Sequence, residues 1–176
     1  MHDTNLKVVF FGGEPLGVPA LEALFKAHII PDLVVCNTDK PVGRDHIVTL
    51  PPVKIWAQEH DIEVLQPDSL KDQTVIDTLT KTPWDLFVVV AYSKILPKIL
   101  VDFPKFGTIN LHPSLLPKLR GASPIRTSIL EGLKDTGVTI MLMDELMDHG
   151  PVLAQKQIEV EEPILGRDLD THLSKE

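Results

Sequence analysis

Short apolar runs alternate along the chain with segments that have helical periodicity. Apolar runs rich in Val, Ile and Phe predict buried strands at 6–11, 33–36, 86–91 and 108–111. Apolar residues at helical spacing predict helices at 16–27, 52–60 and 70–80. Later runs predict strands at 136–142 and 152–159, and residues 168–176 resemble the start of a helix. The pattern therefore predicts strands and helices in alternation.

This alternation predicts the fold class. Strands that are apolar along their whole length are buried on both faces, and intervening helices connect parallel strands. We therefore expect an α/β fold, a Rossmann-like domain with a mostly parallel central sheet flanked by helices. A chain of 176 residues is long enough for one domain with a substantial core. No internal repeat or linker divides it, so we expect a single domain over residues 1–176.

Charge narrows the range of functions. The formal net charge is −8, which argues against a chain that grips nucleic acid over its whole surface. The charge is unevenly distributed, because residues 103–130 contain no Asp or Glu but do contain Lys105, Lys118, Arg120 and Arg126. Such a stretch is either an ordinary solvated segment or a local positive field suited to an anionic substrate.

Cysteine content and the absence of long apolar segments indicate the compartment. Cys36 is the only cysteine, which excludes an internal disulfide and a cysteine-based zinc site. The N-terminus lacks the apolar segment of a secretory signal, and no run approaches the roughly 20 apolar residues of a membrane span. We therefore expect a cytoplasmic monomer that makes no membrane contact.

Three polar residues are the strongest candidates for catalysis. Asn110 and His112 are two apart at the end of a predicted strand, so their side chains share one face of the sheet. Pro113 cannot donate to a sheet ladder and helps to end the strand. Asp148 follows later, beside a Gly-Pro turn. An amide, an imidazole and a carboxylate in these places are able to converge on one reacting carbon.

Two alternative sites are weaker. The turn at 11–15 contains two adjacent glycines, but a dinucleotide site requires a fuller G-x-G-x-x-G pattern, so a structural turn is favoured. A metal site built from His112, His149 and Asp148 is conceivable. These residues lack a compact spacing such as H-E-x-x-H, and we expect no bound metal.

The polar segment 39–46 predicts a surface loop, because it contains Pro41 and Gly43. It is either a plain connection or a functional loop. Its length and its cations, Lys40 and Arg44, favour a functional loop. The fork of donors on Arg44 suits a phosphate group.

The chain resembles the folate-dependent formyltransferases in an ordered set of motifs. These are Asn110-x-His112-Pro-Ser114-Leu-Leu-Pro117-Lys-Leu-Arg120-Gly121, then Thr136-Gly-Val-Thr-Ile140, then Met143-Asp-Glu with Asp148-x-Gly-Pro151. The resemblance covers nearly the whole chain. It implies a Rossmann-like catalytic domain that uses 10-formyltetrahydrofolate as co-substrate and no metal. It also implies that Asn110, His112 and Asp148 are the catalytic residues.

The resemblance further implies a folate site. The family's tetrahydrofolate-binding segment corresponds to Ser114, Leu115, Leu116 and Pro117. The walls of its pterin pocket correspond to Val90, Tyr92, Ile95 and Leu96, and to Asp144, Glu145 and Leu146. The acid loop departs from the family's usual M-D-x-G-L-D-T-G pattern. Here the Gly, Leu and Thr are replaced by Leu146, Met147 and His149.

Other motifs indicate the acceptor. Asp39-Lys40-Pro-x-Gly-Arg44, Pro52-Val-Lys54 and Arg120-Gly-Ala-Ser-Pro-Ile125 are most similar to the family members that formylate initiator methionyl-tRNA. The resemblance implies that Lys40 and Arg44 reach toward the acceptor end of the tRNA. Those members carry a C-terminal β-barrel domain, which we expect to be absent from residues 1–176. Other amine acceptors, hydrolysis of formyl-folate, and folate binding without catalysis are the alternatives.

The chemistry of formyl transfer accounts for the residue types. Transfer from N10 of folate to an amine passes through a tetrahedral intermediate, whose oxyanion requires hydrogen-bond donors. We expect Asn110 and His112 to stabilise that oxyanion. We expect Asp148 to orient the imidazole and to take part in proton transfer. Whether His112 itself acts as the acid or only holds a donor in place is left open by the sequence.

Overall fold

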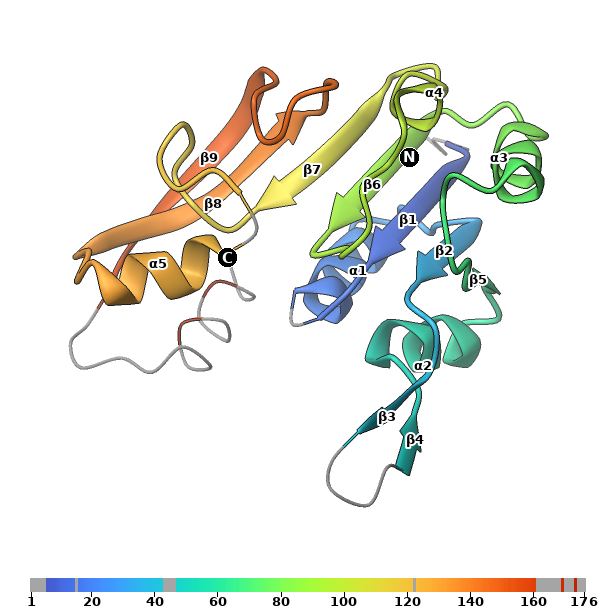
Figure 1. The fold of residues 1–176 in the computed structure, drawn as a ribbon, viewed down its shortest axis with the longest axis horizontal. Coiled ribbons are helices and arrows are strands. Elements are labelled where there is room, and N and C mark those ends of the chain that lie inside the picture. The colour runs from blue at the N-terminus through green and yellow to red at the C-terminus, as the bar shows by residue number, and fades with distance from the viewer. Residues whose placement is uncertain are drawn as a thin grey trace.

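A seven-stranded sheet forms the centre of the fold (Figure 1). The computed structural model describes residues 6–14, 16–42, 47–121 and 123–160, together with Leu169 and Leu173. In spatial order the strands are β5 (Glu63–Leu65), β2 (Leu33–Cys36), β1 (Val8–Gly12), β6 (Leu86–Val90), β7 (Thr108–His112), β8 (Asp135–Leu142) and β9 (Val152–Glu159). The pairings from β5 to β7 are parallel, and β8 and β9 add antiparallel pairings. The predicted mostly parallel α/β sheet is therefore confirmed.

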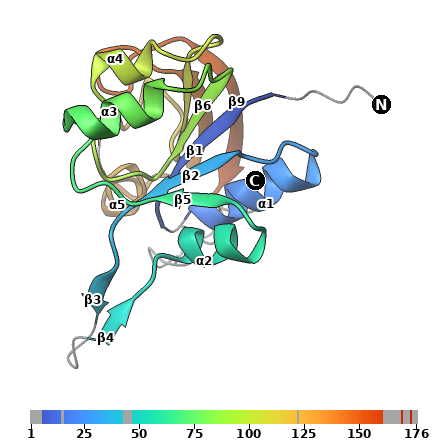
Figure 2. The ribbon, with the colours of Figure 1, turned by 90° about the vertical axis from the view of Figure 1, so that its right-hand side faces the viewer.

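Helices cover both faces of this sheet. One face carries α1 (Gly17–Lys26), α2 (Pro52–Glu59) and α5 (Pro124–Leu130), and the other carries α3 (Gln73–Thr80) and α4 (Lys98–Val101). Figure 2 shows α1 and α2 on the opposite side of the strands from α3 and α4. Two clusters of buried side chains result, one on each face of the sheet. The strands are buried on both faces, as their continuous apolar runs predict.

The predicted strands and helices within the described residues are present, with small shifts at their ends. Five elements were not predicted, namely β3 (Lys40–Val42), β4 (Ile47–Thr49), β5, α4 and α5. Strand β5 and helix α4 are too short to show a periodicity, and α5 follows a stretch of turn-forming residues. Most of the helix predicted at 168–176 lies outside the described residues. Leu169 and Leu173 are described; both are helical, and both are buried against the cluster that contains α1.

The surface loop predicted at 39–46 is wrong for residues 40–42. Strand β3 (Lys40–Val42) pairs antiparallel with β4 (Ile47–Thr49), so the segment is part of a hairpin. The β-branched residues in both segments favour this pairing. The hairpin projects from the body of the molecule near α2 (Figures 1 and 2). Arg44 lies outside the described residues.

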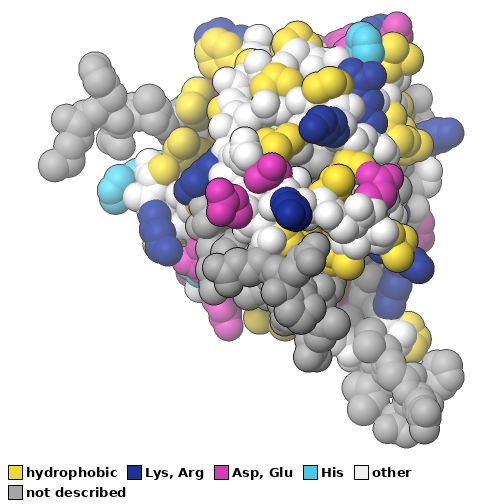
Figure 3. Space-filling view, turned by 90° about the vertical axis from the view of Figure 1, so that its left-hand side faces the viewer, with side chains coloured by type: hydrophobic (Ala, Val, Ile, Leu, Met, Phe, Trp, Pro, Cys, Tyr) yellow, Lys and Arg dark blue, Asp and Glu magenta, His cyan; other side chains and the backbone are white. Residues whose placement is uncertain are grey.

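The edge strand β9 borders the side of the molecule shown in Figure 3. Most of its residues are exposed, including Val152 and Leu153. On this side, basic, acidic and hydrophobic side chains of the described residues are interspersed (Figure 3). None of the helices in the described part of the chain is long and apolar enough to cross a bilayer.

Candidate active site

A cavity of about 860 Å³ lies at the carboxyl ends of β1, β6 and β7. The strand order reverses here, because β1 lies between β2 and β6. Open α/β sheets bind their ligands at such a point, and ligand pockets typically have volumes of about 300–1,000 Å³. Gly13 permits a close approach between two of the strand ends, since a side chain there would overlap the carbonyl oxygen of Ala91. Position, size and backbone geometry all indicate a ligand site.

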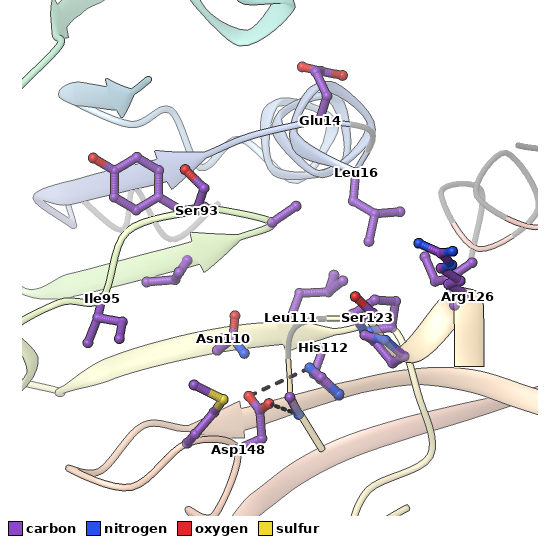
Figure 4. Close-up of a pocket in the computed structure, with 18 of the residues that line it drawn as sticks. Glu14, Leu16, Ser93, Ile95, Asn110, Leu111, His112, Ser123, Arg126 and Asp148 are labelled. Atoms are coloured by element: carbon purple, nitrogen blue, oxygen red, sulfur yellow. Dashed lines mark hydrogen bonds and ion pairs between the residues drawn. The ribbon is translucent and has the colours of Figure 1, made fainter. Parts of the chain in front are cut away.

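The walls of the cavity lie on two sides of Asn110. Figure 4 shows Ser93 and Ile95 on one side of this residue, where the chain leaves β6. Leu16, from the start of α1, and Arg126, from α5, lie on the other side. Two ligands bound on opposite sides of Asn110 would therefore meet at this residue.

Asn110 presents an unpaired carboxamide to the cavity. The residue lies in the middle of β7, between Val89 of β6 and Met141 of β8. Its backbone is held by the sheet, while its side chain makes no hydrogen bond with any of the described residues. The amide is therefore rigidly placed and free to donate to a ligand.

His112 ends β7 and is held in one orientation. Its Nε2 atom lies 2.9 Å from the carbonyl oxygen of Leu119. Since a carbonyl oxygen can only accept, Nε2 must carry the hydrogen. The other nitrogen, Nδ1, lies 3.6 Å from Oδ1 of Asp148. Nδ1 is thus the imidazole nitrogen available for chemistry, and it faces a carboxylate.

The orientation of the Asp148 carboxylate is set by a hydrogen bond to the oxygen that does not face His112. Its Oδ2 accepts the backbone N–H of Gly121 at 2.8 Å, which directs Oδ1 toward the imidazole. The side chains of His112 and Asp148 are only 6% and 12% exposed, so solvent screens their interaction weakly. The backbone of Asp148 has a φ of 48°, a conformation that residues other than glycine seldom adopt. Figure 4 shows Asp148 and His112 together beside Asn110.

Comparison with known proteins identifies the family. The family model described as formyl transferase matches residues 6–172. The chain belongs to the formyl transferase family. This match includes the strand that carries Asn110 and His112 and the loop that carries Asp148.

Curated relatives of the chain are named methionyl-tRNA formyltransferase. One from Halalkalibacterium halodurans is 43% identical over 155 residues, which are 88% of this chain and 49% of that protein. One from Chloroflexus aurantiacus (strain J-10-fl) is 46% identical over 156 residues, or 88% of this chain and 50% of the relative. The chain therefore spans about half the length of these curated relatives.

A solved structure shares the fold. The phosphoribosylglycinamide formyltransferase of Bacillus halodurans superposes with a TM-score of 0.77 at 26% identity. The superposition covers 95% of this chain and 87% of the other. The Rossmann-like fold of the chain is thus shared with a formyltransferase that has a different named acceptor.

The residues that we expected on one pterin wall separate into two groups. Tyr92 and Ile95 line the cavity, whereas Val90 and Leu96 are buried in the two core clusters beneath it. The hydroxyl of Tyr92 is buried and has no hydrogen-bond partner in the described structure. Burial raises the pKa of Tyr92 to about 12, and the nearby Cys36 adds to this effect. Tyr92 therefore stays a neutral phenol at the cavity wall.

The segment Ser114 to Pro117 does not line the cavity. The hydroxyl of Ser114 donates to the carbonyl oxygen of Lys118 at 2.8 Å, and its carbonyl accepts from Thr139 at 2.6 Å. The carbonyl oxygen of Leu116 accepts from Gln155 at 2.8 Å. These bonds anchor the turn to β8 and β9, and this turn leads to the Leu119 carbonyl that holds His112. In this structure the segment does not contact the cavity itself but holds in place the turn that orients His112.

The other expected pterin wall, at residues 144–146, also lies outside the cavity. Met147 and Asp148 of the same loop line it instead. The carboxylate of Glu145 lies 3.7 Å from the ammonium group of Lys98, and Leu146 is exposed. The side chain of His149 contacts Asp144 rather than joining His112 and Asp148. The described residues contain no group of three or more potential ligands that could hold a metal ion.

One wall of the cavity was missed by the sequence analysis. Helix α5 supplies Ile125, Arg126 and Ile129, and the turn after β1 supplies Glu14 and Leu16. Burial raises the pKa of Glu14, and a hydrogen bond from the Val53 backbone partly offsets this rise. The apolar pair four residues apart, after Ser-Pro, was the available signal for α5.

Of the two residues expected to contact tRNA, only Lys40 is described, and it lies away from the cavity. Lys40 is an exposed residue of β3, in the hairpin that projects near α2 (Figure 1). It is not among the residues that line the cavity. Its expected partner, Arg44, lies outside the described residues.

Proposed function

We propose that this protein transfers the formyl group of 10-formyltetrahydrofolate to the amino group of initiator methionyl-tRNA in the cytoplasm. The observation that carries the reaction class is the His112–Asp148 pair, with Nδ1 and Oδ1 3.6 Å apart, beside the free amide of Asn110. Membership of the formyl transferase family supports the same reaction. The names of the relatives in H. halodurans and C. aurantiacus support methionyl-tRNA as the acceptor.

The reaction exchanges one carbon–nitrogen bond for another. The amine attacks the formyl carbon, its bond to N10 of the folate breaks, and a proton passes from the amine to N10. The carbonyl oxygen carries negative charge in the tetrahedral intermediate. Groups that donate to this oxygen without moving lower the barrier, each typically by about 3–4 kcal/mol.

Asn110 and His112 supply such donors. The amide of Asn110 is unpaired and projects from a rigid strand. His112 has committed its Nε2 hydrogen to Leu119, so it donates to an oxyanion only when Nδ1 is also protonated. The Asp148 carboxylate faces that nitrogen and orients the charged imidazole. In this proposal Asp148 also accepts the proton of the attacking amine.

The two walls of the cavity separate the two substrates. The pterin ring occupies the side lined by Tyr92 and Ile95, where apolar surface suits a flat aromatic ligand. The acceptor enters on the side of Leu16 and Arg126, where Arg126 forms no ion pair with the described residues. Its charge is therefore available to a phosphate of the tRNA end. The hairpin that carries Lys40 contacts the tRNA farther from the reacting amine. We also expect Arg44 to contact the tRNA.

The test compares acceptors with the purified protein. With 10-formyltetrahydrofolate, formylation is measured for initiator methionyl-tRNA, for a ribonucleotide amine and for water. We expect transfer to methionyl-tRNA in the wild type. The His112→Ala variant, which lacks the imidazole, should lose about 10²-fold or more of the rate. Hydrolysis at an equal rate without an acceptor would favour a formyl-folate hydrolase, and folate binding without turnover would favour a binding module.

A further inference from the structure

The loop that carries Asp148 is closed by a second acid–histidine pair, located outside the cavity. Nδ1 of His149 lies 2.7 Å from Oδ2 of Asp144. The other oxygen of Asp144 accepts the backbone N–H of Leu146 at 2.8 Å. One carboxylate therefore joins the start of the loop to its end, and Asp148 lies between these two points. We propose that Asp144 and His149 are positioning residues that hold Asp148 in its reactive place.

Asp148 requires such support because its backbone conformation is uncommon. Its positive φ is rarely stable unless surrounding contacts impose it. The base of the loop is fixed by two backbone hydrogen bonds: Leu142 donates to Pro151 at 2.9 Å, and Met143 donates to Thr108 at 2.7 Å. Between this base and Asp148, the Asp144–His149 contact is a cross-link made by side chains. Because His149 follows Asp148 directly in the chain, a small shift of His149 would move the Asp148 carboxylate.

Hydrogen bonds, and to a smaller extent nearby charges, favour an ionised Asp144. The hydrogen bond from His149 is the largest cause that lowers the pKa of Asp144, followed by that from the Leu146 backbone. Lys98 on α4 adds a favourable charge, and it also lies 3.0 Å from Asp102 and 3.7 Å from Glu145. A charge-assisted hydrogen bond is stronger than a neutral one, which suits a pair that must hold a loop.

The position of Asp148 has a direct reporter. Its Oδ2 accepts the backbone N–H of Gly121, which lies on a separate loop. If Asp148 moves, this amide loses its partner and exchanges its hydrogen with solvent faster. The exchange rate of the Gly121 amide therefore reports the position of Asp148 without any substrate.

The experiment compares three variants with the wild type. In His149→Ala we expect faster exchange at Gly121 and a fall in kcat of about ten- to hundredfold, with an unchanged melting temperature and little change in the KM for folate. In His149→Gln, whose amide can still donate to Asp144, both the exchange rate and kcat should stay near wild type. Gln73→Ala is the matched control, because it breaks an exposed side-chain hydrogen bond to Asp77 within α3 and removes no contact of the Asp148 loop. It should change neither quantity.

Unchanged exchange at Gly121 in His149→Ala would overturn the inference, as would loss of kcat in His149→Gln equal to that in His149→Ala. The role given to Asp148 in catalysis rests on the proposed function, but the exchange measurement does not. Faster exchange together with a wild type that formylates no tRNA would support the positioning pair and contradict the proposed function.

Discussion

At the scale of residues, the chemistry depends on which hydrogen-bonding groups are already occupied. The carbonyl of Leu119 accepts the Nε2 hydrogen of His112, so only Nδ1 can face a substrate. The Gly121 N–H occupies one oxygen of Asp148 and leaves the other for the imidazole. Asn110 keeps both of its amide hydrogens free within the described structure. Backbone groups at 119 and 121 therefore select the atoms of two side chains that act in the proposed mechanism.

The charge of Asp148 can be tested apart from its hydrogen bond. In Asp148→Asn the side-chain oxygen can still accept from Gly121, but the carboxylate charge that faces His112 is gone. We expect a fall in single-turnover formyl transfer of about 10²–10⁴-fold, with little change in the free energy of unfolding. Rapid-quench kinetics and urea denaturation measure the two quantities. Turnover at the wild-type rate would contradict the role given to this carboxylate.

At the scale of elements, the hairpin of β3 and β4 depends on a polar cluster at its base. The ammonium group of Lys54, on α2, donates to both oxygens of Asp39 at 2.9 and 2.8 Å. Gln66 donates to the same carboxylate at 2.8 Å and to the carbonyl oxygen of Asn37 at 2.7 Å. These contacts join the end of β2 to α2 and to the segment after β5. They set the direction in which the hairpin leaves the sheet.

This cluster makes stability depend on pH. The hydrogen bond from Lys54, and then that from Gln66, lowers the pKa of Asp39 below its ordinary value of 3.8. Because the folded pKa is the lower one, the stabilisation is present above pH 3.8 and is lost as the pH falls through the folded pKa. We expect Lys54→Met to have a lower melting temperature than the wild type at neutral pH. Its melting temperature should also fall less than that of the wild type as the pH drops below about 4.

Thermal unfolding followed by circular dichroism from about pH 3 to 7 measures this effect. Lys71→Met serves as the control, because Lys71 is exposed and makes no ion pair within the described part of the chain. An acid-induced decline in Lys54→Met as steep as in the wild type would show that the cluster does not contribute.

At the scale of the whole molecule, one sheet joins the two halves of the core. Leu21 of α1 and Leu79 of α3 are both fully buried, on opposite faces of the strands. The cavity lies where the carboxyl ends of the central strands β1, β6 and β7 meet. Its shape therefore depends on both halves, although no side chain of α3 lines it.

Loss of packing on either face should destabilise the whole domain. Leu21→Ala and Leu79→Ala should each lower the free energy of unfolding by about 2–5 kcal/mol, because each leaves a cavity in a closed core. Urea denaturation followed by fluorescence and by circular dichroism should give one coincident transition in both variants. Ile99→Ala is the control, since Ile99 is 56% exposed, and it should change stability far less. Separate transitions for the two probes would mean that the halves unfold independently.

Prediction from the sequence succeeded where a signal is local and repeated. Val34 and Val89 lie in runs that are apolar on both faces, and such runs indicate a covered parallel sheet. It failed for α5 and β5, whose few residues hold less than two periods. Of the expected pterin wall, Tyr92 and Ile95 line the cavity but Val90 and Leu96 are buried in the core, because successive residues of a strand and its following turn point in different directions.

The sequence by itself determined the order of the longer strands and helices, the parallel character of the sheet, and the placement of Asn110 and His112 on one strand. These follow from the periods of strands and helices, which a few consecutive residues reveal. Only the tertiary structure decided that Nδ1 of His112 faces Asp148, and that α5 and Met147 complete the cavity. Those facts depend on contacts between segments far apart in the chain. The packing of the segments, rather than any local pattern of residues, decides which side chains meet.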